Sequence, residues 1–162
     1  MAVPTLFKAL QASPLGSTIS QSTWMFPTIE TVHVMAVATV IGTIAVVDLR
    51  LLGLASRRRS ASALIEEFLP WTWGAFALAL VSGGLLFTSR AADYMALPFF
   101  LSKFAIMAVA AANMLVFHLT AERRIAAWDL GRPITGARVA GGLSLLLWAA
   151  IVICGRQVGF SL

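Results

Sequence analysis

Four long apolar runs constrain what this chain can fold into. They cover residues 31–47, 68–89, 104–121 and 139–155, and charged residues bound each of them. A helix needs roughly 20 apolar residues to cross about 30 Å of hydrocarbon, and each run approaches that length. The regular alternation of polar and apolar residues that a membrane β-barrel requires is absent. The sequence therefore predicts an all-α membrane protein, a bundle of four transmembrane helices.

The composition agrees with a lipid environment. Hydrophobic residues make up 59% of the chain and charged residues 12%, and the mean hydropathy is +0.88. A soluble domain is typically about one quarter charged, so this chain has too little polar surface to cover itself in water. The net charge of +5 then indicates contact with anionic lipid headgroups, and no nucleic-acid partner is expected.

The distribution of lysine and arginine predicts the orientation, because cytoplasmic loops carry an excess of these residues. The first and third loops, with the helix ends beside them, hold eight, against four on the opposite side. The eight are Arg50, Arg57, Arg58, Arg59, Arg123, Arg124, Arg132 and Arg138, and the four are Lys8, Arg90, Lys103 and Arg156. We therefore expect a bacterial inner-membrane protein with both termini on the periplasmic side.

The chain divides into a short N-terminal segment and a membrane domain. Residues 1–26 are expected to lie in the periplasm, and residues 27–162 to form the four-helix transmembrane domain. Pro4 begins a stretch, residues 5–11, that predicts a short helix at the membrane interface. Cys154 is the single cysteine, which excludes an intrachain disulfide.

Prolines and glycines predict where the spanning helices begin and pack. Because proline suits the first turn of a helix, Pro27, Pro70 and Pro98 are expected near the starts of the first three spanning helices. The third helix is expected to continue through "TAERRIAAW", residues 120–128. The glycine pair at residues 83–84 permits a close helix contact or a bend.

Ionisable residues lie on one face of the first spanning helix. In "PTIETVHVMAV", Glu30 and His33 are three residues apart and therefore neighbours on a helix. Asp48 follows about five full turns after Glu30, so the two acids share an azimuth. Charged groups in a membrane segment face the protein interior and find partners there. This stripe therefore predicts a polar face directed into the bundle.

The third span carries a matching stripe of Lys103, Met107 and His118. If the two stripes face each other, Glu30 meets Lys103 in the outer leaflet, and the first and third helices form a polar seam. The inner-leaflet polar cluster would then contain Asp48, His118 and Arg123. The same alignment separates His33 from His118 by about 18 Å of helix rise, so they cannot both ligate one haem in one protomer.

The outer leaflet then collects soft ligands. The metal or cofactor candidates are His33, Met107 and Cys154, and the charges that would support them are Glu30, Lys103 and Arg156. Imidazole, thioether and thiolate suit copper, Cu(I) especially. These residues could also have purely structural roles. Met107 would then fill space in the core, Cys154 would be a small buried apolar residue, and Glu30 and Lys103 would form a salt bridge between helices.

The chain also resembles a known group of proteins, in four segments: "ETVHVMAVATVIGTIAVVDLRLLGL", "LPWTWGAFALALVSGGLLF", "FLSKFAIMAVAAANMLVFH" and "CGRQVGF". These segments resemble small four-span bacterial membrane proteins of unknown function, over nearly the whole chain. That group is distantly similar to the membrane domain of the copper-resistance D family, in which a histidine near the start of a helix precedes small residues. The resemblance implies that His33 corresponds to this histidine of the copper-resistance D family.

Three functions remain open on the sequence alone. The first is a membrane protein whose outer-leaflet Glu/His/Lys site binds a metal ion, copper first, or a cofactor. The second is a b-haem electron carrier, with His33 paired to Met107 or to the same histidine of a second copy. The third is a structural or anchoring subunit of a larger membrane complex, without a cofactor. The expected partners are the lipid bilayer and either a second copy of the chain, in a homo-oligomer, or a larger membrane complex. No nucleophile–base set is visible, so we do not expect an enzyme.

Overall fold

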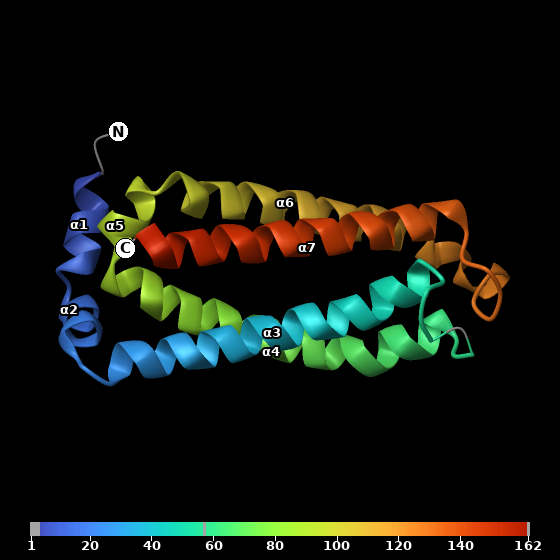
Figure 1. Ribbon diagram of the computed structural model, residues 1–162, viewed down its shortest axis with the longest axis horizontal. Helices are drawn as coiled ribbons and strands as arrows, with labels where there is room; N and C mark the ends of the chain where they lie inside the picture. The colour runs from blue at the N-terminus through green and yellow to red at the C-terminus, as the bar shows by residue number, and fades with distance from the viewer. Residues whose placement is uncertain (1–3, 57, 162) are drawn as a thin grey trace.

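The computed structural model describes residues 4–56 and 58–161, so Arg57 and residues 1–3 and 162 lie outside the described residues. Four helices of the described chain are long and apolar enough to cross a membrane. They are α3 (Met25–Leu51), α4 (Ala61–Ser89), α6 (Pro98–Leu119) and α7 (Thr135–Ser161). These four run side by side along the long axis of the molecule (Figure 1), and the described residues contain no strand. The predicted all-α four-helix bundle is confirmed.

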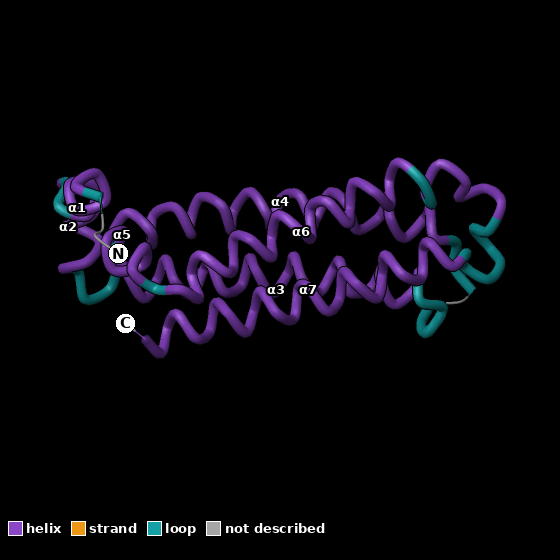
Figure 2. The backbone as a smooth tube through the Cα atoms, turned by 90° about the horizontal axis from the view of Figure 1, so that it is seen from above, coloured by secondary structure: helices purple, strands orange, loops and turns teal. Residues whose placement is uncertain are grey.

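The bundle consists of two helical hairpins. Helix α3 packs on α4, and α6 packs on α7, while α3 and α7 form the contact between the hairpins (Figure 2). A hydrogen bond of 2.8 Å from Thr72 to Thr43 ties α4 to α3. The Asn113 amide donates to the Ala140 carbonyl at 3.0 Å and ties α6 to α7. Neighbours in sequence are thus neighbours in space, as short connections favour.

The expected seam between the first and third spanning helices is wrong. Helix α3 packs mainly on α4 and α7, and the described residues give it no extensive contact with α6. Gly141 of α7 explains the choice, because a Cβ there would lie 3.0 Å from the Asp48 carbonyl oxygen and 3.0 Å from the Cβ of Leu51. A helix with no side chain at this position lets the α3 backbone approach closely.

Three short helices and the C-terminal end of α7 lie together at one end of the bundle, which we call the terminal end (Figure 1). They are α1 (Thr5–Gln11), α2 (Pro14–Gln21) and α5 (Ala91–Ala96). Helix α1 has the predicted bounds, whereas α2 was not predicted. Ser13 caps α2 by accepting from the Gly16 N–H at 3.2 Å, and proline is its first residue. The opposite end, with the α3–α4 and α6–α7 connections, is the loop end.

Two helix boundaries differ from the sequence expectations. Helix α4 begins at Ala61, because Ser60 caps it and accepts from the Ala63 N–H at 3.2 Å. Pro70 therefore lies inside α4 and not near its start. Helix α6 begins at Pro98 as predicted but ends at Leu119, and the 3₁₀ helix η1 (Glu122–Ala127) replaces the expected continuation.

Side-chain burial differs sharply between the loop end and the spans. A core cluster at the loop end contains Leu51, Ala61, Phe117, Ala121, Trp128 and Ala137. In contrast, none of the most apolar 18-residue stretch of α6 is buried within the protein. Large apolar side chains such as Leu80, Val81 and Leu146 remain exposed on the other spans. A surface of this kind is stable when lipid covers it.

Candidate functional site

His33 lies on α3 and points into the contact with α4. Its Nδ1 is 3.1 Å from the Ala79 carbonyl oxygen and 3.1 Å from the Ser82 hydroxyl. Gly83 makes room for the ring, since a Cβ at that position would lie 2.9 Å from Cε1 of His33. The sequence predicted a close contact at the glycine pair of residues 83–84, and Gly83 makes that contact with the His33 ring.

The hydrogen bonds of His33 define which ring nitrogen carries the proton. The Ala79 carbonyl can only accept, and the Ser82 hydroxyl donates its own hydrogen to the Leu78 carbonyl at 2.6 Å. Both partners of Nδ1 are therefore acceptors, so Nδ1 carries a hydrogen. In the neutral imidazole Nε2 then keeps its lone pair, which is the tautomer that histidine ligands use when Nδ1–H donates to a carbonyl.

Glu30 lies one turn before His33 and is exposed. The ion pairs of the described chain are Arg59–Glu67 and His118–Glu122, so the predicted Glu30–Lys103 bond is not formed. The physical reason is the helix arrangement, because α3 packs mainly on α4 and α7 and has no extensive contact with α6 among the described residues. The charge of Glu30 still acts on His33 and on Tyr94 of α5.

Lys103 is half-buried on α6 and is directed toward α7. Its Nζ would lie 3.9 Å from a Cβ built on Gly155. Its charge interacts with Cys154 and also acts on His33. None of the described carboxylates lies within ion-pair distance of this ammonium. An ammonium in a membrane helix without a carboxylate partner is costly, and such groups mark functional sites.

The remaining predicted residues of the outer site are distributed over α6 and α7. Met107 and Cys154 are half-buried, and Cys154 is a free thiol. Arg156 is exposed, and its guanidinium lies 4.4 Å from the centroid of the Phe160 ring on its own helix. This contact lies within α7. In the part of the chain that the structure describes, no group of three His, Cys, Asp or Glu side chains is arranged to hold a metal ion.

The predicted inner-leaflet cluster is not assembled. Asp48 is buried and interacts with the Ser144 hydroxyl of α7, and its Oδ2 has no hydrogen-bond partner. His118 pairs instead with Glu122, four residues along the same stretch of chain. Arg123 is exposed. The cluster fails for the same reason as the seam, because Asp48 faces α7 while His118 belongs to α6.

A polar clamp at the loop end was missed by sequence reasoning. Arg50, only 1% exposed, donates from Nε to the Arg59 carbonyl at 2.8 Å and from Nη2 to the Asp129 carbonyl at 2.6 Å. The Asp129 carboxylate accepts from the Ser62 N–H at 2.8 Å and from its hydroxyl at 2.6 Å. These residues, the loop-end clamp, bind the α6–α7 connection to the N-terminus of α4. Arg50 was counted only as a topology charge, and nothing in its sequence neighbourhood distinguishes it.

The electrostatics of Asp129 fit this capping role. Desolvation would raise the pKa of its carboxyl group, but hydrogen bonds from Ser62 and Ala61 and the charge of Arg50 outweigh that effect. The pKa of Asp129 therefore lies below its ordinary value. A carboxylate beside the first turn of α4 also interacts favourably with the helix dipole.

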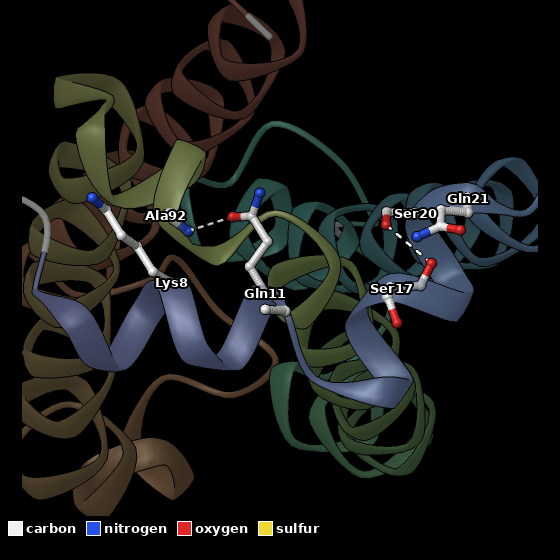
Figure 3. A pocket seen from close by; sticks show the side chains of 7 residues that line it. Lys8, Gln11, Ser17, Ser20, Gln21 and Ala92 are labelled. Carbon is white, nitrogen blue, oxygen red and sulfur yellow. Dashed lines mark hydrogen bonds between the residues drawn. The ribbon is translucent and has the colours of Figure 1, made fainter.

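A polar hollow lies over the terminal end (Figure 3). It has a volume of about 370 Å³, and its lining includes Lys8, Gln11, Ser17 and Gln21. The Gln11 side chain accepts from the Ala92 N–H at 2.9 Å and so joins α1 to α5. The hydroxyl of Ser17 donates to the Pro14 carbonyl and is therefore used within α2. We interpret this hollow as a depression in the surface of the packed short helices α1, α2 and α5.

Comparison with known protein families, with curated proteins and with solved structures finds no match. The class of the protein therefore rests on its own geometry. Four helices long and apolar enough to span a bilayer pack as two hairpins and leave their apolar faces exposed. The chain is a multi-pass integral membrane protein of the four-helix type.

Proposed function

We propose that the half of the bundle next to the terminal end binds a metal ion, copper first, through Nε2 of His33. The observation that carries the proposal is the position of the imidazole. Its Nδ1 is held by Ala79 and Ser82, and Gly83 leaves space for the ring. A histidine oriented in this way presents a preorganised nitrogen ligand at low entropic cost.

The other donors are the soft side chains of the opposite hairpin. Met107 and Cys154 are both half-buried, and Lys103 lies beside Cys154. Thiolate, thioether and imidazole ligands together select Cu(I). The resemblance to the copper-resistance D family supports the same metal. Glu30, whose charge also acts on His33, would balance the charge of the bound cation.

A second candidate is haem b, and Lys103 favours it. An ammonium that no described carboxylate neutralises suits a haem propionate. In this case Nε2 of His33 would bind the haem iron, together with Met107 or the same histidine of a second copy. The cofactor would provide one-electron chemistry, and the protein would bind it and orient its edges.

The test compares the two histidines. Bound copper and haem are measured per folded protein, by elemental analysis and by absorption spectroscopy, after expression with copper and haem supplied. We expect His33→Ala to lose the bound group while the helix content is kept, because one polar side chain contributes nothing to membrane insertion. His118→Ala is the matched control, since that imidazole pairs with Glu122 at the other end.

Each outcome of this test decides between the candidates. Copper without a Soret band supports the metal site, and a Soret band lost with His33→Ala supports haem b. A folded wild-type protein that binds neither, or a His33→Ala variant with full occupancy, contradicts both. The structural-subunit function would then be the better reading.

We also propose that the protein lies in a bacterial inner membrane with the terminal end facing the periplasm. The excess of arginine at the loop end supports this orientation. In a Cys154→Ala background, a cysteine at the exposed Ser20 should react with an impermeant reagent added outside. A cysteine at the exposed Arg58 should not, and its labelling from outside would reverse the orientation.

A further inference from the structure

A second hollow lies at the loop end, where α6, η1 and the start of α7 meet. Its volume is about 460 Å³. Two arginines, Arg123 and Arg124, line it together with Thr120 and the apolar side chains of Leu119 and Ile134. The hollow therefore combines a cationic wall with an apolar one, and it lies where a spanning helix emerges from the bilayer.

The two arginines are free to bind a ligand. Among the described residues, neither guanidinium takes part in a hydrogen bond or an ion pair. The two acids nearest to them in sequence are engaged elsewhere, since Glu122 pairs with His118 and Asp129 accepts from Ser62. Guanidinium groups bind phosphate oxygens in a bidentate way, so an uncommitted pair of them favours a phosphate group.

The apolar wall of the hollow indicates which kind of phosphate-containing ligand fits it. Leu119 is 48% exposed and Ile134 is 37% exposed. Leu115, one turn before Leu119 on α6, and Val139 of α7 are also exposed. A free inorganic anion gains nothing from this surface. A phospholipid gains from both walls, because its headgroup meets the arginines and its acyl chain covers the apolar side chains.

We propose that this hollow is a binding site for an anionic phospholipid, whose headgroup phosphate lies against Arg123 and Arg124. The site is separate from the proposed copper site, and it does not depend on that function. It is also more specific than the general attraction of a basic loop to a charged membrane, because it assigns the selectivity to these two arginines.

The test measures lipid selectivity in the purified full-length chain. Protein in a mild detergent is equilibrated with dioleoylphosphatidylglycerol or dioleoylphosphatidylcholine, and retained lipid is counted by native mass spectrometry. The wild type should prefer the anionic lipid. Arg123→Ala with Arg124→Ala should reduce this preference by roughly 30-fold, from the typical contribution of each arginine near an anionic headgroup.

The control is Arg58→Ala with Arg132→Ala, which removes the same charge from two exposed arginines of the loop end that do not line the hollow. This variant should keep the wild-type preference. An equal loss in both variants would mean general electrostatic attraction and would overturn the proposal, as would a wild type without preference. Displacement of the lipid by millimolar inorganic phosphate would reveal a free-anion site and would overturn it too. If the alanine pair does not fold, Arg123→Gln with Arg124→Gln makes the same comparison.

Discussion

Two cationic side chains near opposite ends of the bundle, Arg50 and Lys103, differ in how they are paired. At the loop end, Arg50 is almost fully buried and its guanidinium donates to two backbone carbonyls. Toward the terminal end, Lys103 is half-buried without a described carboxylate partner, and Nε2 of His33 keeps a free lone pair. Both side chains are cations in an apolar protein, but of the two only Arg50 is satisfied by groups of the protein itself.

This difference separates a buried cation that stabilises the fold, Arg50, from one that the proposed ligand site would use, Lys103. The loop-end clamp holds two chain connections together, and the core cluster of Leu51, Phe117 and Trp128 lies beside it. Groups that are buried and fully paired rigidify a fold. Ionisable groups left without partners in a membrane segment are costly to retain, and this favours a ligand as their missing partner.

The largest effect is expected from breaking the clamp. Arg50→Ala should lower the free energy of unfolding by about 3–5 kcal/mol, because it leaves buried carbonyl groups without donors and opens a cavity. The measurement is thermal or denaturant unfolding in detergent. Arg132→Ala, at an exposed arginine of the same end, should stay within about 0.5 kcal/mol of the wild type. Equal effects of the two variants would show that the clamp does not stabilise this end.

A smaller effect should come from crowding His33. Gly83→Ala places a Cβ 2.9 Å from the imidazole, so it should displace the ring and cost about 1–3 kcal/mol of stability by overpacking. The amount of copper or haem bound per folded protein should also decrease in Gly83→Ala. Gly84→Ala is the matched control, because a Cβ there has nothing within 4 Å. That variant should keep its occupancy and gain up to about 1 kcal/mol, as alanine favours a helix over glycine. A Gly83→Ala protein with full occupancy would argue against the position of the ring.

The smallest effect concerns the charge on Asp129. Asparagine keeps one oxygen that can accept from the Ser62 N–H, but its NH2 group cannot accept from the Ser62 hydroxyl. Asp129→Asn therefore removes the charge and one acceptor, and it should cost about 1 kcal/mol at neutral pH. Because the pKa of Asp129 is lowered in the folded protein, its contribution is complete above the unfolded value near ~4. It is lost as the pH falls through the folded pKa. The difference between the two proteins in unfolding experiments should therefore close at acid pH, and a difference that widens there would contradict this role.

Helix positions in this protein were more predictable than helix partners. The start of α6 at Pro98 and the whole of α1 follow from local rules about proline and helix ends. The early start of α4 was missed because Glu66 and Glu67 look like loop residues, although the Ser60 cap and the Arg59–Glu67 ion pair extend the helix beyond the apolar run. The charged residues before the apolar run suggest a loop, whereas the Ser60 cap favours a helix, and the sequence alone does not show which effect is larger.

The candidate site shows the same limit. His33 was selected from the sequence because it is ionisable and lies in a membrane helix, and that criterion is local. Its partners, Ala79 and Ser82, lie on α4, and no local feature of the sequence connects that helix with His33. The predicted Glu30–Lys103 pair depended on two helices facing each other, which a stripe of residues on each helix cannot establish.

The sequence by itself determined that this chain crosses a membrane with four helices. Apolar length and the need to satisfy every backbone hydrogen bond in lipid are properties of each segment, so they can be read one segment at a time. Only the tertiary structure decided that α3 meets α4 through His33 and α7 through Gly141. Those choices depend on where glycines on distant helices allow a close approach, and that is a property of pairs of helices and not of either one.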